Sequence, residues 1–442
     1  MHDLVLKDCK LVNEGATLEC DIAIHRGRVE QIGRGLSGRT EATVGGAHVM
    51  PGMIDDQVHF REPGMEHKAT VATESAAAVA GGVTSFLEMP NCIPQTIDAD
   101  RLEKKHQRAS EVAHANYGFY LGATNDNLEE IKRINVHRAC GIKVFMGAST
   151  GNMLVDDPRA LGDIFRCSPL LVATHCEDTP IILENERLAR TRFGADVPAW
   201  EHPNIRSVEA CFKSSSLEVD HAKRHGTRLH VLHLTTEREM CLFGTGALKD
   251  KRITAEVCVH HLFFDDRAYA KKGADIKCNP AVKSSEDRTA LLRAVIEDRI
   301  DVIATDHAPH TRKEKDQAFM DAPAGMPLVQ HAIPVLLSMV AEGAFSLETV
   351  VNKIAHAPAI CYAIKDRGFV REGYWADLVV LDLDRPTVVD EQRLLSKCAW
   401  SPFAGMRFPG SIRQTYVNGV LGYDRGRIVP AVKGRAIEYD RA

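Results

Sequence analysis

The chain has 442 residues, of which 44% are hydrophobic and 26% charged, an ordinary mixture for a globular protein with a large core. This length exceeds one minimal domain, although a single α/β barrel alone takes about 250 residues. The 55 Lys and Arg residues and 60 Asp and Glu residues leave a formal net charge of −5. This near balance argues against nucleic acid or an anionic membrane surface as the main partner.

The cysteines and the N-terminus indicate a compartment. The chain contains 12 cysteines and no CxxC pair, which suits neither a disulfide scaffold nor a zinc ribbon. The first residues, MHDLVLKDCK, contain no basic segment followed by an apolar stretch. No apolar run approaches the roughly 18 residues that a membrane helix needs. We therefore expect a soluble protein of the cytoplasm.

The two ends of the chain share a β-rich texture. Short strand-like runs with turn residues between them fill the first 50 residues, as in LECDIAIHRGRVEQIG, and return near the end in ADLVVLDLD and SIRQTYVNGVLGY. The pattern predicts a small composite β-sandwich domain formed by residues 1–50 and 367–442. The alternative is two unrelated sheet extensions.

The middle of the chain, residues 51–366, alternates short apolar runs with helix-length segments. Eight such runs with helices between them predict an α/β fold, a (β/α)8 TIM barrel with its helices outside. The predicted strands are GMIDDQVHF, GVTSFLEMPN, NYGFYLGAT, GIKVFMG, LLVATHCED, RLHVLHLTT, ITAEVCVHH and DVIATDHAPH.

Polar residues stand where several of these strands should end. His59, Lys143, His175, His233 and Asp306 belong to predicted strands one, four, five, six and eight. In an α/β barrel the carboxyl ends of different strands converge on one face, where active sites lie. A lone histidine at a strand end is usually structural. Three imidazoles and a carboxylate placed together indicate a site for zinc or a neighbouring divalent metal.

Lys143 is unexpected beside a cationic metal. One interpretation is that its side chain simply extends to solvent. The other is that burial beside positive charge lowers its pKa, so that the free amine reacts with carbon dioxide and becomes an anion able to bridge two metals. The spacing alone does not choose between them.

The run DDQVHFREPG (55–64) resembles the signature of the amidohydrolase superfamily in its dihydroorotase form. The resemblance covers nearly the whole chain. It continues through EMPN (88–91), GIKVF (141–145), THCED (174–178), LHVLHLTT (229–236), NPAVKSSEDR (279–288), ATDHAPHT (304–311), APAGMPL (322–328), GYWADLVVLD (373–382) and WSPFAGM (400–406).

The resemblance implies a metal centre with one or two Zn²⁺ ions. His59 would bind the more buried metal, N-carboxylated Lys143 would bridge, and His175 and His233 would hold the second metal. Asp306 would be both a metal ligand and the general base and acid, taking a proton from the attacking water and passing it to the ring nitrogen of a cyclic amide.

The resemblance also implies a small anionic pyrimidine-type substrate. Dihydroorotate and N-carbamoyl-L-aspartate would be interconverted, as in de novo pyrimidine biosynthesis. A guanidinium group suits such an anion. The implied substrate-binding residues are Arg61 and Asn91 with help from His310, Asn279, and the backbone around Pro323 and Gly325.

One position departs from the family pattern. Relatives usually carry H-x-H at the end of strand one, whereas this chain has Gln57-Val58-His59. Alternation along a strand keeps Gln57 on the same face as His59. An amide oxygen is a poorer zinc ligand than an imidazole nitrogen. We therefore predict a weakened first metal site, with Gln57 as a doubtful ligand.

Other functions remain open at this point. The chain could be an inactive structural partner of aspartate transcarbamoylase, but every other expected ligand is present. It could be an allantoinase or a hydantoinase of the dihydropyrimidinase type, but Arg61 argues against these because their rings need no guanidinium there. Relatives are commonly homodimers, and a transcarbamoylase partner is also open.

Three further features receive weaker interpretations. His260 and His261 are adjacent in a predicted strand and should point to opposite faces, so at most one faces the pocket. Cys176 and Cys258 are interpreted as small buried hydrophobic residues. The small residues of DAPAGMPL suggest a mobile loop over the pocket.

Overall fold

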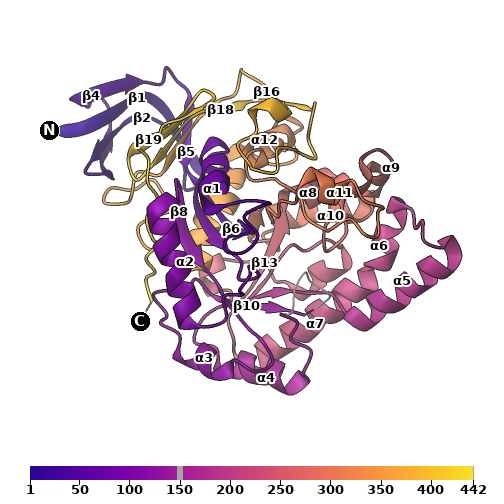
Figure 1. Cartoon of the computed structure of the whole chain (residues 1–442). Coiled ribbons are helices and arrows are strands. Elements are labelled where there is room, and N and C mark those ends of the chain that lie inside the picture. Colours follow the sequence, from indigo (N-terminus) through magenta and orange to yellow (C-terminus); the bar gives the residue numbers. More distant parts are fainter. Residues whose placement is uncertain (147–152, 442) are drawn as a thin grey trace.

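The computed structural model describes residues 1–146 and 153–441. Within them, eight parallel strand positions form a closed ring, the barrel at the centre of Figure 1. The ring consists of β6 (Met53–Val58), β7 (Val83–Glu88), β8 (Asn116–Phe119) continued by β9 (Leu121–Gly122), β10 (Ile142–Phe145), β11 (Val172–His175), β12 (Leu229–Val231), β13 (Ile253–Cys258) and β14 (Val302–Ala304).

Backbone contacts join the two hydrogen-bonded sheets of the ring. His59 N donates to His307 O at 2.7 Å, which brings β6 beside β14. Tyr120, between β8 and β9, donates its backbone N–H to Glu88 O of β7 at 3.1 Å. Every residue of β7 is buried, as expected for a strand covered by helices on one side and by the barrel interior on the other.

Helices surround the barrel. Several begin at a side chain that caps the first turn, as Asp98, Ser207 and Ser284 do. The helices are α1 (Val71–Ala80), α2 (Ala99–Val112), α3 (Leu128–Arg133), α4 (Pro158–Cys167), α5 (Thr179–Phe193), α6 (His202–Ile205), α7 (Val208–His225), α8 (Val259–Phe263), α9 (Tyr269–Lys272), α10 (Ser285–Ile296), α11 (Arg312–Lys315), α12 (Ala332–Ala341), α13 (Leu347–Val351) and α14 (Ala357–Cys361). In the described residues, none of these helices is long and apolar enough to cross a membrane.

Both ends of the chain contribute to a second sheet, seen at the upper left of Figure 1. Its strand order is β20-β19-β18-β15-β5-β1-β2-β3, with β4 paired to β1. The strands are β1 (His2–Asn13), β2 (Ala16–His25), β3 (Arg28–Gly33), β4 (Gly38–Thr43), β5 (His48–Pro51), β15 (Leu378–Asp382), β18 (Ser411–Val417), β19 (Val420–Asp424) and β20 (Arg427–Ile428).

The two ends meet where β5 pairs antiparallel with β15, in a register that places Val49 opposite Val380. The sheet has a hydrophobic core of its own, with Leu6, Ile22 and Leu378 among its buried members. The predicted fold class, a barrel with a sheet domain from both termini, is confirmed. The exact boundaries of the two domains stay predictions.

A buried polar network joins the sheet to the barrel. The carboxylate of Asp377, just before β15, accepts from Asn418 N at 2.7 Å and from Asn116 Nδ2 at 3.3 Å, and it pairs with Arg367. Asn418 Nδ2 donates in turn to Asn116 Oδ1 on β8 at 2.8 Å. Because Asp377 is 4% exposed, removing one partner would leave a buried charge unpaired.

A short strand pair, β16 (Thr387–Val388) and β17 (Arg407–Phe408), brackets a segment that reaches the barrel. In this segment, the indole Nε1 of buried Trp400 donates to His310 O at 2.7 Å. The segment thereby supports the loop that follows β14.

Candidate active site

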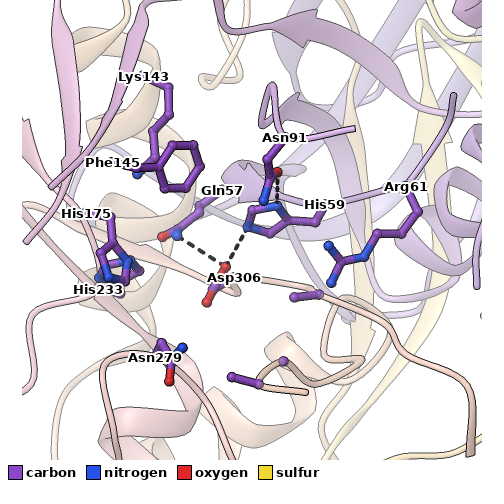
Figure 2. Close-up of a pocket in the computed structure, with 13 residues that line it drawn as sticks. Gln57, His59, Arg61, Asn91, Lys143, Phe145, His175, His233, Asn279 and Asp306 are labelled. Atoms are coloured by element: carbon purple, nitrogen blue, oxygen red, sulfur yellow. Dashed lines mark hydrogen bonds and ion pairs between the residues drawn. The ribbon is translucent and has the colours of Figure 1, made fainter. Parts of the chain in front are cut away.

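The carboxyl ends of the barrel strands surround a polar pocket (Figure 2). It contains every predicted metal ligand and most of the predicted substrate-binding residues. Its lining consists of Gln57, His59, Arg61, Asn91, Lys143, Phe145, His175, His233, Asn279, Asp306, Ala308, Ala324 and Gly325. Residues more than 200 positions apart in the sequence thus share one cavity, as the barrel prediction requires.

Three of these side chains stand on strained backbone. Arg61, His233 and Asp306 have φ values of 69°, 39° and 49°, in the left-handed region that non-glycine residues rarely adopt. Each such residue costs about 1 to 3 kcal/mol and persists only where the surrounding structure imposes it. All three follow a barrel strand and line the pocket. The strained backbone therefore lies in the turns that direct these side chains into the pocket.

Asp306 lies at the centre of Figure 2, between Gln57 and His59. Its Oδ1 lies 3.0 Å from His59 Nε2 and accepts from Gln57 Nε2 at 3.2 Å. His59 Nδ1 lies 2.7 Å from Asn91 Oδ1. Burial acts to raise the pKa of Asp306, but the neighbouring His59 outweighs it and the pKa falls below its usual value. Asp306 is therefore a carboxylate at neutral pH.

Lys143 lies in β10 with its side chain buried. Its Nζ has no hydrogen-bond partner among the described residues and lies 4.6 Å from the centre of the Phe145 ring. Burial lowers the pKa of Lys143 to about 7. A substantial fraction of the lysine is therefore an uncharged amine at neutral pH, the form that reacts with carbon dioxide. Extension of Lys143 to solvent, the simpler interpretation of the sequence, is wrong because the side chain is 1% exposed.

His175 and His233 face each other, with Nδ1 of the first 3.0 Å from Nε2 of the second. The other nitrogen of His175, Nε2, lies 2.9 Å from Glu177 Oε2, and Glu177 pairs with Arg206. A metal-binding imidazole usually donates its second N–H to a carboxylate in this way. Burial opposes ionisation of Glu177, but Arg206 and His175 outweigh it and lower its pKa to about 2.

Glu177 is a residue that sequence reasoning missed. It belongs to the THCED segment, where it follows His175 by two positions. A carboxyl group two residues after a candidate ligand was a usable signal, because a short step beyond the strand can return it to the same imidazole.

Arg61 occupies the side of the pocket opposite His175 and His233 in Figure 2. It is 5% exposed, and its Nε donates to Pro309 O at 3.1 Å. Its Nη2 lies 3.1 Å from His310 Nε2. No carboxylate forms an ion pair with Arg61 in the described part of the chain. This buried cation is therefore available to an anionic ligand.

His310 lies behind Arg61 and does not line the pocket. Lys68 Nζ lies 3.1 Å from His310 Nδ1, which must accept because an ammonium group only donates. His310 Nε2 therefore carries the proton and donates to Ala324 O at 3.0 Å. Burial, reinforced by Arg61, lowers the pKa of His310 far below its usual value. As placed, His310 supports the Ala324 carbonyl.

Asn279 and the segment 322–325 form the remaining wall. Asn279 Oδ1 is buried without a hydrogen-bond partner in the described residues, so an acceptor is available to a ligand N–H. Gly325 has φ 136°, and a Cβ there would lie 2.5 Å from Ala308 O, so glycine is required. Pro323 lies outside the pocket lining, and its carbonyl accepts from Lys315 Nζ at 2.9 Å.

The contacts of this segment do not favour the mobile loop suggested by its small residues. Besides Pro323, Lys315 Nζ also reaches Gly325 O at 3.1 Å, and Lys277 Nζ donates to Ala322 O at 2.6 Å. Two largely buried lysines thus hold the carbonyls of residues 322, 323 and 325 in place.

Sequence comparisons now place the chain among known proteins. A sequence model described as dihydro-orotase-like matches residues 46–151, and one described as the amidohydrolase family matches residues 209–422. A dihydroorotase of Halobacterium salinarum is 33% identical, over 94% of this chain and 96% of that protein. A dihydroorotase of Methanothermobacter thermautotrophicus is 30% identical, over 95% and 94%.

The chain belongs to the amidohydrolase family. An allantoinase of Bacillus velezensis is also similar to this amidohydrolase, at 30% identity over 96% of the chain and 95% of that protein. Among solved structures, an L-hydantoinase from Arthrobacter aurescens superposes with a TM-score of 0.93 at 25% identity, covering 99% of this chain and 100% of that one.

The structure also corrects one sequence interpretation of this amidohydrolase. His260 and His261 lie in helix α8 rather than in a strand, so the argument from opposite strand faces is wrong. Both are buried, and neither lines the pocket. The run ITAEVCVHH looked like one strand because a buried helix turn and a buried strand have similar composition. Burial raises the pKa of Cys176 and Cys258 far above that of an ordinary thiol, which suits inert residues.

Proposed function

We propose that this amidohydrolase is a dihydroorotase, which interconverts dihydroorotate and N-carbamoyl-L-aspartate in de novo pyrimidine biosynthesis. One observation supports dihydroorotate as the substrate over the uncharged rings. Arg61 is a buried guanidinium that faces the pocket without a carboxylate partner among the described residues. A buried charge is costly unless it is paired, so the site favours a substrate that brings its own carboxylate.

The donor set of the pocket fits a zinc centre. If His59 Nδ1 donates to Asn91 Oδ1, the lone pair of Nε2 faces the Asp306 carboxylate, and a cation between them removes the repulsion. His175 and His233 present a second pair of nitrogen atoms 3.0 Å apart. These four residues and N-carboxylated Lys143 would hold the metal. When bound, zinc polarises a carbonyl group and lowers the pKa of water from about 15.7 to about 7.

The Lys143 amine is placed to become the bridging ligand. In the reaction that we propose, its nitrogen lone pair forms a bond to the carbon of carbon dioxide, one C=O electron pair moves to oxygen, and the nitrogen gives a proton to water. The product is a carbamate anion. A buried Nζ without a partner in the described residues, near the imidazoles of His175 and His233, supports this modification.

The chain's own residues then divide the remaining work. Asp306 takes the proton of the attacking water and delivers it to the departing ring nitrogen, a role worth about 10² to 10⁴-fold in rate. Arg61 and the Nδ2 of Asn91 bind the substrate carboxylate, since Asn91 Oδ1 is already occupied by His59. Asn279 Oδ1 accepts a ring N–H, and Gly325 allows the backbone to approach the ring.

Gln57 distinguishes this site from an H-x-H site. Its amide donates from Nε2 to Asp306, while its carbonyl Oε1 lies 3.8 Å from Cys258 Sγ. The opposite orientation would set Oε1 against the Asp306 carboxylate. We propose that Gln57 positions Asp306 and that the metal on this side is held weakly. Zinc per chain after mild chelation tests this. Gln57→His should retain more zinc than the wild type, whereas two tightly held ions in the pocket of the wild type would contradict the proposal.

Turnover of a substrate panel tests the proposed function. Zinc- and bicarbonate-loaded protein should hydrolyse dihydroorotate with a far higher kcat/KM than hydantoin or allantoin. The allantoinase relative and the hydantoinase-like structure make these two rings the informative competitors. Preference for either ring would overturn the assignment. No turnover of any ring by loaded protein would favour the inactive structural partner of aspartate transcarbamoylase.

The assembly and location also stay proposals. We infer a cytoplasmic homodimer from the resemblance to dihydroorotases, with a transcarbamoylase as a second partner to be tested. Light scattering of the purified chain, alone and mixed with aspartate transcarbamoylase, measures both.

A further inference from the structure

A second group of metal-ligating side chains lies inside the barrel, away from the pocket lining. Asp56 on β6, His230 on β12 and Glu256 on β13 are all 0% exposed. Their ligand atoms lie within 4.8 Å of one another. The proposed function uses none of these side chains.

The hydrogen bonds of His230 place a proton on its Nδ1. Thr254 Oγ1 donates its only proton to Leu229 O at 3.1 Å, so it accepts from His230 Nδ1 at 2.7 Å. In a neutral imidazole, Nε2 then presents a lone pair. This lone pair faces Asp56 Oδ2 at 3.2 Å and Glu256 Oε2 at 3.5 Å. Three electron-rich atoms thus converge, and something positive must lie between them.

The carboxylates have few other partners. Glu256 Oε1 accepts from His233 N at 3.0 Å, but its Oε2 and both carboxylate oxygens of Asp56 accept no hydrogen bond from the residues that the structure describes. Nor does any described lysine or arginine form an ion pair with Asp56 or Glu256. Burying a carboxylate in a barrel interior without a compensating charge costs on the order of several kcal/mol of folding free energy.

We propose that Asp56, His230 and Glu256 bind a divalent metal ion, zinc or a neighbouring transition metal, at a structural site distinct from the pocket. The proposal does not rest on the proposed function. Tetrahedral zinc bonds to nitrogen and oxygen of about 2.0–2.2 Å give ligand-to-ligand edges of about 3.3 to 3.6 Å. The two contacts of His230 Nε2 are 3.2 and 3.5 Å, so the side chains already stand at the separations of a coordination sphere. An imidazole that donates its other N–H to a protein oxygen is also the usual arrangement of a metal ligand.

The competing account places a proton on His230 Nε2. Two carboxylates and one imidazolium leave a net charge of −1 in a fully buried group, and a second proton on Glu256, whose pKa burial raises, is needed to reach zero. Two carboxylates, a neutral imidazole and a divalent cation leave a net charge of zero, which burial favours. The ion would also hold Glu256, whose other oxygen binds the backbone of His233, a pocket residue on strained backbone.

Anomalous scattering at the zinc edge from crystals of zinc-loaded wild-type protein tests the proposal directly. We expect a peak about 2.0–2.2 Å from Asp56, His230 and Glu256, separate from any peak in the pocket. A map without this peak, with His230 Nε2 hydrogen-bonded directly to Asp56, would overturn the proposal in favour of the imidazolium.

Metal analysis of variants gives a second measurement. After mild chelation, Asp56→Asn should contain one zinc ion per chain less than the wild type. Asp55→Asn is the matched control, because Asp55 is equally buried but is already bound by Thr305 Oγ1 at 2.6 Å. His175→Asn should lose pocket zinc and keep the interior ion. Equal zinc in Asp56→Asn and wild type contradicts the proposal. If Asp56→Asn does not fold, the wild-type map still decides, and neither result depends on dihydroorotate turnover.

Discussion

The pocket and the junction between barrel and sheet are both buried and polar, but their polar groups differ in how many hydrogen-bond partners they have. At the junction, the Asp377 carboxylate has an arginine, an asparagine side chain and a backbone N–H as partners. In the pocket, Lys143 Nζ, His233 Nδ1 and Asn279 Oδ1 have no hydrogen-bond partner among the described residues. Most buried polar groups in proteins are paired, so unpaired groups gathered in one cavity indicate atoms reserved for a ligand, whereas a buried charge with several partners, as at Asp377, indicates stability.

The largest effect should come from Asp306. We expect Asp306→Ala to lower kcat/KM for dihydroorotate by about 10⁴-fold, because the variant loses a proton-transfer group and a proposed ligand together. The melting temperature of the metal-free protein should change little or rise, since a buried charge on strained backbone is removed. A variant that melts at a lower temperature but keeps high turnover per folded molecule would show that Asp306 serves stability, as Asp377 does, and would contradict the comparison.

The opposite result is expected at the junction. Asp377→Ala should lower the free energy of unfolding by about 3 to 5 kcal/mol, because Arg367 loses its buried partner. Turnover per folded molecule at low temperature should stay within a few-fold of the wild type. Urea unfolding and active-site titration measure the two quantities. A stable but inactive Asp377→Ala protein would show that the junction acts on the pocket.

The sequence predicted the residues of the pocket better than the group of polar side chains inside the barrel. His59, His175, His233 and Asp306 were found because ligands at the ends of barrel strands follow from strand periodicity and barrel geometry. The group of Asp56, His230 and Glu256 was not found, because its members stand within strands, where a sequence gives no signal that three side chains meet across the barrel. The joint terminal sheet was predicted from the β-rich composition of both ends, whereas the pairing of β5 with β15 and its register come from the structure.

One strand assignment is wrong, and one expected loop movement is not favoured by the contacts. The run that ends in His260 and His261 was assigned to one strand, although the chain turns into α8 at Val259. The segment around Gly325 was taken for a loop free to move, because the sequence does not show that Lys277 and Lys315 bind its carbonyls.

Arg61 should affect substrate binding more than chemistry. We expect Arg61→Ala to raise KM for dihydroorotate by about 10- to 150-fold, the equivalent of about 1.5–3 kcal/mol for hydrogen bonds to a charged group. The KM of Arg61→Lys should fall between those of the wild type and Arg61→Ala, because lysine keeps the charge but not the planar fork of the guanidinium group. Steady-state kinetics with dihydroorotate and hydantoin make the comparison. Equal losses for both rings would show that Arg61 serves the fold rather than the carboxylate.

The smallest effect should come from Glu177, which contacts His175. Glu177→Gln should weaken zinc binding by about 10- to 100-fold, as for other groups that orient a metal-binding histidine. Competition with a chromophoric chelator measures the affinity. Arg206 pairs with the same carboxylate, so retention of full zinc affinity in Glu177→Gln would show that this pair belongs to the stability network instead.

A zinc titration of the metal-free protein tests the central claim that this pocket is a metal-dependent cyclic amidase. With bicarbonate present and dihydroorotate as substrate, turnover should rise in proportion to zinc bound by the wild type and stay near zero in a His175→Asn, His233→Asn double variant. Full activity without metal, or zinc bound in the pocket without any turnover of dihydroorotate, would contradict the account.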